Sequence, residues 1–324
     1  MPQPQKFKLN SGYEIPAVGL GTWLSKPNEV ALAVEHALKV GYRHIDAAAI
    51  YQNEHEVGRG WKRSGVPRED IFITSKLWNT DHHPGRVEAA LDATLKDLQT
   101  DYLDLYLIHW PVSFVYRPGE LFPKDPTTGL FQHLNVSISD TWAAMEKLVG
   151  TGKVKSIGVS NFTIERIEEL LKTAKIPPAV NQIEAHPWLQ QPKLFEYLKS
   201  KNILIESYSP LGNNIYGHDR VIDDPTINTI AKRLNVDVGQ MLVNWAVQRG
   251  TVVLPKSVTP SRIESNLKGF VIPPAEFEEI NGLDKHKRFN LPYDWAVDIF
   301  GEVGQTEIER RAAEAAAASR TASA

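Results

Sequence analysis

The chain has 324 residues, and at about 150 residues per domain this length alone predicts two domains. Lysine and arginine (36) nearly balance aspartate and glutamate (39), which argues against a basic protein that binds nucleic acid or anionic membranes. The absence of cysteine excludes disulfides, thiolate metal sites and a cysteine nucleophile. Residues 1–11 lack the apolar stretch of a secretory signal, and no apolar run reaches the roughly 20 residues of a membrane span. We therefore expect a soluble, cytoplasmic protein.

The chain opens with a predicted β-hairpin over residues 7–18, with its turn at residues 10–12. After it, short apolar runs alternate with amphipathic stretches. Most of these runs are continuous, which is typical of parallel strands buried on both faces. The eight predicted strands cover residues 18–22, 45–48, 71–77, 103–110, 156–159, 180–183, 203–208 and 252–254.

The stretches between these strands carry apolar residues at helical spacing. Residues 27–40, for example, have a proline near the first turn and are followed by Gly41, an asymmetry that helices prefer. The predicted helices cover residues 27–40, 86–98, 140–149, 164–171, 193–199, 226–234, 238–248 and 260–267. Eight strand–helix units in about 250 residues favour a single closed (β/α)8 barrel over two domains.

Two segments lie outside this repeating pattern. Residues 111–136 form a long stretch rich in Pro, Gly and Phe, and a loop of this length usually binds a ligand or covers a site. The tail from Thr306 is charged and then rich in alanine, so we expect a frayed helix or disorder there. The barrel is therefore expected to occupy residues 1–305 as one domain, followed by a tail over residues 306–324.

Polar residues stand where the predicted strands end. In a (β/α)8 barrel, functional side chains lie at the carboxyl ends of the strands. Any one of these residues could instead cap a helix or form a structural pair, but eight at corresponding positions indicate a functional face. They are Asp46, Lys76, His109, Asn161, Gln182, Glu184, Tyr208 and Lys256.

Seven motifs accompany these positions in a fixed order. They are Gly41-Tyr-Arg-His-Ile-Asp46 with Tyr51 and Glu56-Val-Gly58, Thr74-Ser-Lys76-Leu-Trp78, Leu107-Ile-His109-Trp-Pro111, Gly158-Val-Ser-Asn-Phe162, Asn181-Gln-Ile183, Tyr208-Ser-Pro-Leu-Gly212 and Leu254-Pro-Lys-Ser257. The ordered set resembles the signatures of the aldo-keto reductase family over about residues 7–300. This resemblance implies a (β/α)8 barrel that binds NADPH without a Rossmann domain. Consistently, Gly19-x-Gly21 is followed by Trp23-Leu24 and does not complete a G-x-G-x-x-G motif.

By the same resemblance, Asp46, Tyr51, Lys76 and His109 form the catalytic group. Tyrosine, with an ordinary pKa of about 10, is a poor acid near neutral pH. The ammonium of Lys76 would lower that pKa, and Asp46 would hold Lys76 in place through an ion pair. His109 would hydrogen-bond the substrate oxygen, orient it and assist proton delivery.

The resemblance also implies a cofactor site. Ser160, Asn161 and Gln182 would hydrogen-bond the nicotinamide carboxamide, and Tyr208 would stack on the ring. Ser209 and Leu211 would contact the pyrophosphate, Lys256, Ser257 and Arg262 the 2′-phosphate of the ribose, and Asn266 the adenine. Thr22 and Val258 would also belong to the cofactor site. Two cations and a hydroxyl suit the 2′-phosphate of NADPH better than the free hydroxyl of NADH. Ser265 departs from the pattern, because many members carry Glu or Gln there.

The substrate pocket would be walled by Trp23, Trp78 and Trp110, which would accept the apolar part of a small aldehyde. The segments 111–136 and 285–302 would close it. Residues 288–302 resemble the fungal-type NADPH-dependent glycerol dehydrogenases and glyceraldehyde (aldehyde) reductases of this family. Asp81-His82-His83 has no second ligand cluster at matching spacing, so we interpret it as a polar loop and expect no metal.

The sequence therefore predicts a monomeric NADPH-dependent reductase of small aldehydes and aldoses, reversible toward glycerol or polyol oxidation. A xylose, pentose or uronate reductase of the same family is an alternative. A catalytically idle barrel that binds NADPH as a regulatory subunit is another, and an unrelated barrel such as a phosphate-binding isomerase is a third. A turnover assay and a cofactor-binding assay would separate these hypotheses.

Overall fold

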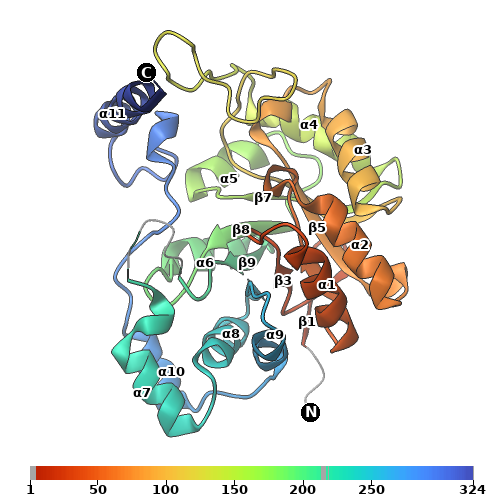
Figure 1. The fold of residues 1–324 in the computed structure, drawn as a ribbon, viewed down its shortest axis with the longest axis vertical. Helices are drawn as coiled ribbons and strands as arrows, with labels where there is room; N and C mark the ends of the chain where they lie inside the picture. The colour runs from red at the N-terminus through yellow and green to blue at the C-terminus, as the bar shows by residue number, and fades with distance from the viewer. Residues whose placement is uncertain (1–4, 213–216, 218, 324) are drawn as a thin grey trace.

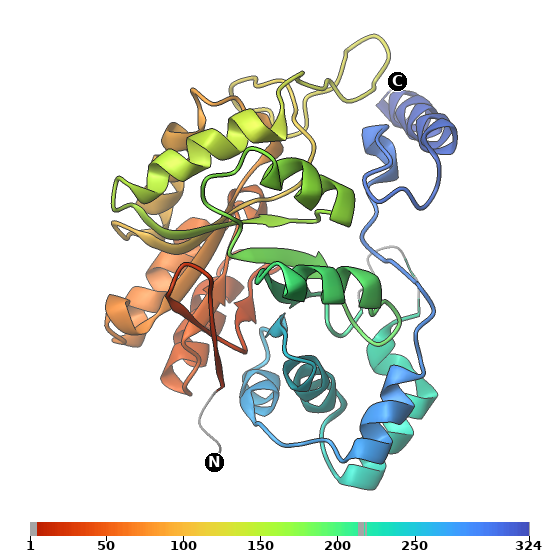
Figure 2. The ribbon, with the colours of Figure 1, turned by 180° about the vertical axis from the view of Figure 1, so that it is seen from behind.

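A computed structural model describes residues 5–212, 217 and 219–323 of the chain. In this part of the chain, eight parallel strands form a barrel with helices around its outside (Figure 1, Figure 2). The predicted (β/α)8 architecture is confirmed. None of the helices found there is both long and apolar enough to cross a membrane.

Each barrel strand pairs in parallel with the next one along the chain. The strands are β3 (Leu20–Gly21), β4 (His44–Asp46), β5 (Phe72–Leu77), β6 (Leu103–Ile108), β7 (Val154–Ser160), β8 (Val180–Glu184), β9 (Leu204–Tyr208) and β10 (Val252–Leu254). The backbone N–H of Val253 donates to the carbonyl of Ala17 at 2.8 Å, and that of Gly19 donates to the carbonyl of Val253 at 2.9 Å. These bonds join the last strand to the first and close the ring.

The eight predicted helices are present with bounds shifted by at most a few residues. They are α1 (Glu29–Lys39), α3 (Val87–Leu98), α4 (Ile138–Val149), α5 (Ile164–Leu171), α6 (Pro192–Ser200), α7 (Pro225–Leu234), α8 (Val238–Gln248) and α9 (Pro260–Leu267). Their apolar faces and the outer faces of the strands make up the main core. Short 3-10 turns are η1 (Ala49–Tyr51), η2 (Arg68–Asp70), η3 (Asn79–Asp81), η4 (Val221–Asp223) and η5 (Tyr293–Trp295).

The N-terminal hairpin closes one end of the barrel. Strand β1 (Lys6–Lys8) pairs antiparallel with β2 (Glu14–Pro16), as predicted. Leu9 and Ile15 are buried against residues near the starts of strands, including Phe72 and Val180. The hairpin therefore fills the amino end of the barrel, and the carboxyl ends of the strands remain available for a site.

Helix α2 (Glu54–Ser64) was not predicted, because its sequence shows little apolar periodicity. Glycines let it lie close to its neighbours. A Cβ on Gly58 would come 2.5 Å from the carbonyl oxygen of Asp97, and one on Gly60 would come 2.6 Å from that of Ala31. Two glycines thus add close backbone contacts to the packing of Val57 and Trp61 against the main core.

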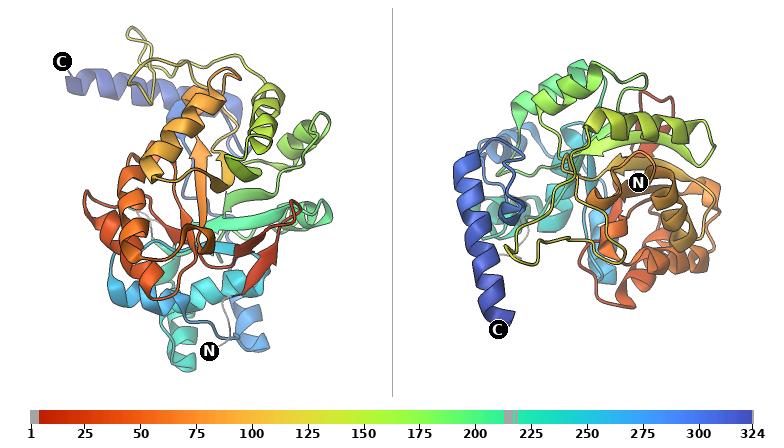
Figure 3. Two further views of the ribbon diagram at one scale, coloured as in Figure 1. Left: turned by 90° about the vertical axis from the view of Figure 1, so that its right-hand side faces the viewer. Right: turned by 90° about the horizontal axis from the view of Figure 1, so that it is seen from above.

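The C-terminal part of the chain adds α10 (Pro274–Asn281) and α11 (Gln305–Ser323), neither of which was predicted as a defined helix. In α11, Ile308, Ala312 and Ala316 are buried at four-residue spacing, so one face of this helix packs against the rest of the protein. Arg320 donates to the carbonyls of Thr127 and Thr128, which ties the helix to the long loop between β6 and α4 (Figure 3). Alanine's high helix propensity and the burial of one face explain why this stretch is helical.

We expect Gly58→Ala to lower the free energy of unfolding by about 1–2 kcal/mol. The new methyl group clashes with backbone atoms of α3, and the cost of this clash exceeds the stabilisation that alanine gives a helix relative to glycine. Urea unfolding followed by circular dichroism measures this change. Gly150→Ala is the matched control, since a Cβ there meets only the carbonyl of Lys147 at an ordinary 3.6 Å. Equal stability of the two variants would contradict this account of the contact between α2 and α3.

Candidate active site

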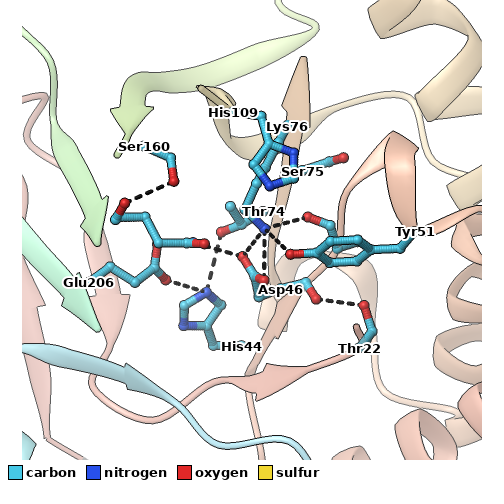
Figure 4. Close-up of polar contacts among 12 residues, drawn as sticks. Thr22, His44, Asp46, Tyr51, Thr74, Ser75, Lys76, His109, Ser160 and Glu206 are labelled. Atoms are coloured by element: carbon cyan, nitrogen blue, oxygen red, sulfur yellow. Dashed lines mark hydrogen bonds and ion pairs between the residues drawn. The ribbon is translucent and has the colours of Figure 1, made fainter. Parts of the chain in front are cut away.

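A buried lysine organises the carboxyl end of the barrel. Lys76 is fully buried in β5, and its Nζ lies 2.8 Å from both carboxylate oxygens of Asp46, the last residue of β4. It also donates to the carbonyl of Ala47 at 2.8 Å and to the hydroxyl of Tyr51 at 3.3 Å (Figure 4). The ammonium therefore joins the carboxylate to the phenol, as the sequence-based assignment requires.

The fourth member of the predicted catalytic group, His109, directly follows β6. Its ring centroid lies 5.9 Å from that of Tyr51 and 5.5 Å from that of Trp78, edge-on in both cases. His109 is 7% exposed, and no described residue hydrogen-bonds to its ring. A buried imidazole without a protein partner beside a phenol is suited to bind a polar group of a ligand.

Burial, more than charge, sets the proton affinity of the phenol. Removal from water raises the pKa of Tyr51 to about 12, and this effect outweighs the lowering by the Lys76 ammonium. The expected lowering by Lys76 is therefore present, but it is not the net result. Tyr51 is a neutral phenol at ordinary pH, and any tyrosinate formed would lie beside an ammonium.

Lys76 and His109 also have defined protonation states. Burial by itself would lower the pKa of Lys76, but Asp46 and Tyr51 raise it above its ordinary value, so the amine stays protonated. Burial, followed by the charge of Lys76, lowers the pKa of His109 well below its usual range. His109 is therefore a neutral imidazole that can donate one hydrogen bond and accept another.

Asp46 is held by a residue of β8 and by one that follows β3. Gln182 Nε2 donates to its Oδ1 at 2.9 Å, and the hydroxyl of Thr22 donates to its backbone carbonyl at 2.8 Å. Asn53, which precedes α2, donates to the carbonyl of Thr22 at 2.9 Å. Thr22, predicted as a cofactor residue, thus supports the catalytic carboxylate in this structure.

The predicted nicotinamide residues meet at the ends of β7, β8 and β9. Ser160 Oγ and the backbone N–H of Asn161 both donate to the carbonyl of Gln182, at 2.8 and 2.9 Å. The Asn161 amide donates to the carbonyl of His109 at 3.0 Å and accepts from the hydroxyl of Tyr208 at 2.6 Å. These bonds position the half-buried Tyr208 ring beside Gln182 and connect it to His109.

The predicted phosphate residues follow β10 in one loop and the start of α9. Lys256 is exposed and donates only to the carbonyl of Leu24, at 3.2 Å. Arg262 is exposed and makes no ion pair with any residue described. Ser257 accepts from the backbone N–H of Thr259 at 3.1 Å, and Val258 is half-buried beside it. Two cations and a hydroxyl therefore lie within one short segment of the surface.

The rest of the predicted cofactor set lies in two places. Asn266 is buried in α9. Ser265, next to it, donates to the carbonyl of Arg262 at 3.2 Å, so its hydroxyl has a local partner. Ser209 has a positive φ of 50° directly after β9, and Leu211 packs against the core formed by α7 and α8.

Aromatic side chains line the entrance beside Tyr51 and His109. Trp23 lies 6.5 Å from Tyr51 between ring centroids, and Trp110 stacks at 6.4 Å on His109. Trp78 is buried, and its indole N–H donates to the carbonyl of Leu121 in the long loop at 2.7 Å. All three predicted tryptophans therefore adjoin the catalytic group.

A fourth tryptophan of this wall was missed as a site residue. The ring of Trp295 lies 5.9 Å from that of Trp78, 5.2 Å from that of Trp110 and 5.2 Å from that of Phe114. It comes from the C-terminal segment that was expected to close the pocket. No periodic pattern marks it, because it lies in the short 3-10 turn η5 and not in a barrel strand.

Glu184, at the end of β8, anchors this segment. It is fully buried and accepts from the backbone N–H groups of Phe289 and Asn290 at 2.8 Å each, and from His186 at 2.9 Å. Burial opposes ionisation, but these hydrogen bonds and the charges of His186 and Arg288 lower the pKa of Glu184 below its ordinary value. A carboxylate on the barrel thus fixes the loop that carries Trp295.

The Asp81-His82-His83 stretch differs from the polar loop expected. His82 is fully buried, and its Nδ1 lies 2.9 Å from the hydroxyl of Ser113, so it connects η3 to the long loop. Asp81 pairs with Arg86 at 2.8 Å. Within the described parts of the chain, no group of three or more His, Asp or Glu residues is arranged to hold a metal ion.

Comparisons with known proteins agree with this geometry. The aldo/keto reductase family model matches residues 17–287. Glycerol 2-dehydrogenase (NADP(+)) of Saccharomyces cerevisiae is 48% identical over 87% of this chain and 91% of its own length. D/L-glyceraldehyde reductase of Hypocrea jecorina is 45% identical over 95% of this chain and 96% of its own.

A solved structure, the aldose reductase from Schistosoma japonicum, matches with a TM-score of 0.83 and 44% identity over 89% of this chain and 95% of that one. It shares the barrel fold that positions the Asp46–Lys76–Tyr51 group here. The fold, the family match and these relatives lead to one conclusion: the chain is an oxidoreductase of the aldo/keto reductase family.

Proposed function

We propose that this enzyme catalyses the NADPH-dependent reduction of small aldehydes and aldoses of the glyceraldehyde type to alcohols, and the reverse oxidation of glycerol or polyols. One observation carries the proposal. The buried ammonium of Lys76 contacts both Asp46 and Tyr51, beside a His109 ring to which no described residue hydrogen-bonds. This arrangement provides a proton donor, a charge that stabilises its conjugate base and a group that can orient a carbonyl oxygen.

The residues at the cofactor positions fit NADPH. Lys256 and Arg262 are exposed cations in one segment with Ser257, which suits the dianionic phosphate that distinguishes NADPH from NADH. At the other end, Gln182 and Tyr208 lie next to the catalytic group and offer an amide and a ring face. When bound, NADPH supplies the hydride that is added to the carbonyl carbon.

The side chains of the protein supply the proton and the orientation. Tyr51, a neutral phenol, donates its proton to the carbonyl oxygen of the substrate. The resulting tyrosinate is stabilised by Lys76 at 3.3 Å, and Asp46 keeps the ammonium in place at 2.8 Å. Neutral His109 donates a hydrogen bond to the same oxygen and fixes its position.

The pocket favours a small substrate with an apolar body. Trp23, Trp78, Trp110 and Trp295 surround the catalytic group, and the loops that carry Leu121 and Trp295 lie over it. The names of the relatives from S. cerevisiae and H. jecorina support glycerol and glyceraldehyde as the substrate pair. A xylose, pentose or uronate reductase of the same family is the second candidate, since a longer open-chain sugar presents the same aldehyde.

An unrelated barrel and an idle barrel have less support. The match over residues 17–287 shows that the unrelated phosphate-binding barrel was wrong. An idle regulatory barrel would not need the Asp46–Lys76–Tyr51 contacts, which speaks for an active enzyme. A single barrel domain over residues 1–305 that works as a monomer is part of this proposal. A cytoplasmic location stays a prediction from the sequence.

We expect Tyr51→Phe to lower kcat/KM for DL-glyceraldehyde with NADPH by about 100- to 10,000-fold, because the phenol supplies the proton. Phenylalanine fills the same space, so quenching of tryptophan fluorescence by NADPH should persist. The rate is measured as loss of the reduced nicotinamide absorbance. A variant that keeps its rate within a factor of a few would contradict the assignment of Tyr51, and a wild-type protein without turnover would favour the idle barrel.

Lys256→Ala should reduce the preference for NADPH over NADH, expressed as the ratio of the two kcat/KM values, by about 10- to 100-fold, because one charged hydrogen bond to the 2′-phosphate is lost. Lys268→Ala is the matched control, since this exposed lysine follows α9 outside the predicted phosphate residues. An unchanged ratio in Lys256→Ala would show that the phosphate lies elsewhere.

A further inference from the structure

A buried carboxyl outside the catalytic group lies next to it. Glu206 is in β9, directly beside Gln182 of β8 in the register of the sheet, and it is fully buried. Its Oε2 accepts from Gln182 Nε2 at 2.8 Å, and its Oε1 lies 3.3 Å from His44 Nε2 (Figure 4). The catalytic mechanism above does not use this group, and a buried carboxyl without a function is costly.

The pair formed by Glu206 and His44 is neutral. His44 Nδ1 lies 3.2 Å from the carbonyl oxygen of Pro16, which can only accept, so Nδ1 carries the hydrogen and Nε2 is an acceptor. Burial lowers the pKa of His44 to about 3, and burial together with the charge of Asp46 raises that of Glu206. The carboxyl group therefore keeps its proton, and Oε2, which accepts from Gln182 Nε2, is its carbonyl-type oxygen. His44 Nε2 also lies 3.2 Å from the hydroxyl of Thr74, which can donate to it.

Glu206 and Asp46 together determine which way the Gln182 amide points. The two hydrogens of Nε2 go to Asp46 Oδ1 at 2.9 Å and to Glu206 Oε2 at 2.8 Å. Since both partners are acceptors, the amide nitrogen must face them and the amide oxygen must face away. Among the residues described, none donates to Oε1 of Gln182, which is therefore available to accept from a ligand.

One acceptor would not suffice for this orientation. Asp46 Oδ1 also accepts from Lys76, so it is shared between two donors. A single bond from Nε2 to Asp46 leaves the amide plane free to turn about that bond. The second bond, to Glu206, fixes the plane, and this bond exists because the two residues are direct neighbours in the sheet.

We propose that Glu206 is a positioning residue for the nicotinamide: it holds the Gln182 amide so that Oε1 accepts a hydrogen bond from the carboxamide NH2 of the cofactor. This inference rests on the proposed function, because it requires a nicotinamide cofactor at Gln182. It assigns a purpose to Glu206, which acts through Gln182 and touches neither the substrate nor Tyr51. The carboxamide, once held, sets the rotation of the nicotinamide ring against Tyr208.

The test compares Glu206→Met, which removes the acceptor at similar size, with Glu206→Gln, which mimics the protonated acid. The amide oxygen of Gln can accept from Gln182, and its NH2 can donate to His44. Isothermal titration calorimetry measures Kd for three ligands: NADP+, its 3-acetylpyridine analogue, which lacks the carboxamide NH2, and 2′,5′-ADP, which lacks the nicotinamide. Thermal unfolding is recorded for each variant.

We expect Glu206→Met to weaken NADP+ binding by about three- to tenfold, the loss of one oriented hydrogen bond, and to leave the acetylpyridine analogue and 2′,5′-ADP unaffected. Glu206→Gln should restore the wild-type Kd for NADP+. A purely structural role would weaken all three ligands together, and this result would overturn the inference. Unchanged NADP+ binding in Glu206→Met would overturn it as well.

If Glu206→Met does not give folded protein, the same results are expected of Glu206→Val, because this strand position suits β-branched residues.

The two proposals can fail separately. Absence of NADPH-dependent turnover in the wild type would overturn the proposed function and this inference with it. Turnover in the wild type, combined with equal losses for NADP+ and the acetylpyridine analogue in the Met or Val variant, would overturn the inference alone.

Discussion

The carboxyl end of this barrel depends on one buried ion pair, between Lys76 and Asp46. Burying an isolated ammonium costs several kcal/mol, so the lysine is stable inside the barrel only because the carboxylate and a backbone carbonyl meet it at 2.8 Å. The same contacts keep Lys76 charged beside Tyr51. Groups from three further strands hold Asp46 and its neighbours: Thr22 after β3, Gln182 in β8 and, through Gln182, Glu206 in β9. Removing one of the two charges would leave the other unpaired in the interior.

The two ends of the barrel differ in role: the amino end stabilises the fold, and the carboxyl end carries the candidate active site. At the amino end, the hairpin places Leu9 and Ile15 over the starts of the strands. At the carboxyl end, a separate aromatic cluster that includes Trp78, Phe114 and Trp295 packs the loops together, and polar anchors hold them as well. Glu184 holds the backbone at Phe289 and Asn290, His82 bonds to Ser113, and Arg320 of α11 holds the loop at Thr127 and Thr128. These loops can differ in sequence without disturbing the ion pair beneath them.

The strands and most helices were predictable because each carries a local signal. Continuous apolar runs predicted all eight barrel strands, and helical spacing predicted the eight helices that cover them. Helix α2 was not predicted because it has few apolar residues and its closest contacts are made by two glycines, whose role becomes visible only when α1 and α3 lie against it. The C-terminal helix α11 carries no such local signal, because its alanines are buried by residues far away in the sequence.

The residue types at the strand ends and their order determined the family. The resemblance they carry also predicted that Asp46, Tyr51, Lys76 and His109 form the catalytic group, and the structure brings these four side chains together. Only the tertiary structure decided how these groups are supported. Glu206 lies within a predicted apolar run, His44 directly precedes another, and Trp295 lies in the short 3-10 turn η5, so no local pattern indicates their roles. Their roles arise because closure of the barrel brings β4, β8 and β9 together around one buried space, and hydrogen bonds across that space have no signature in any single segment.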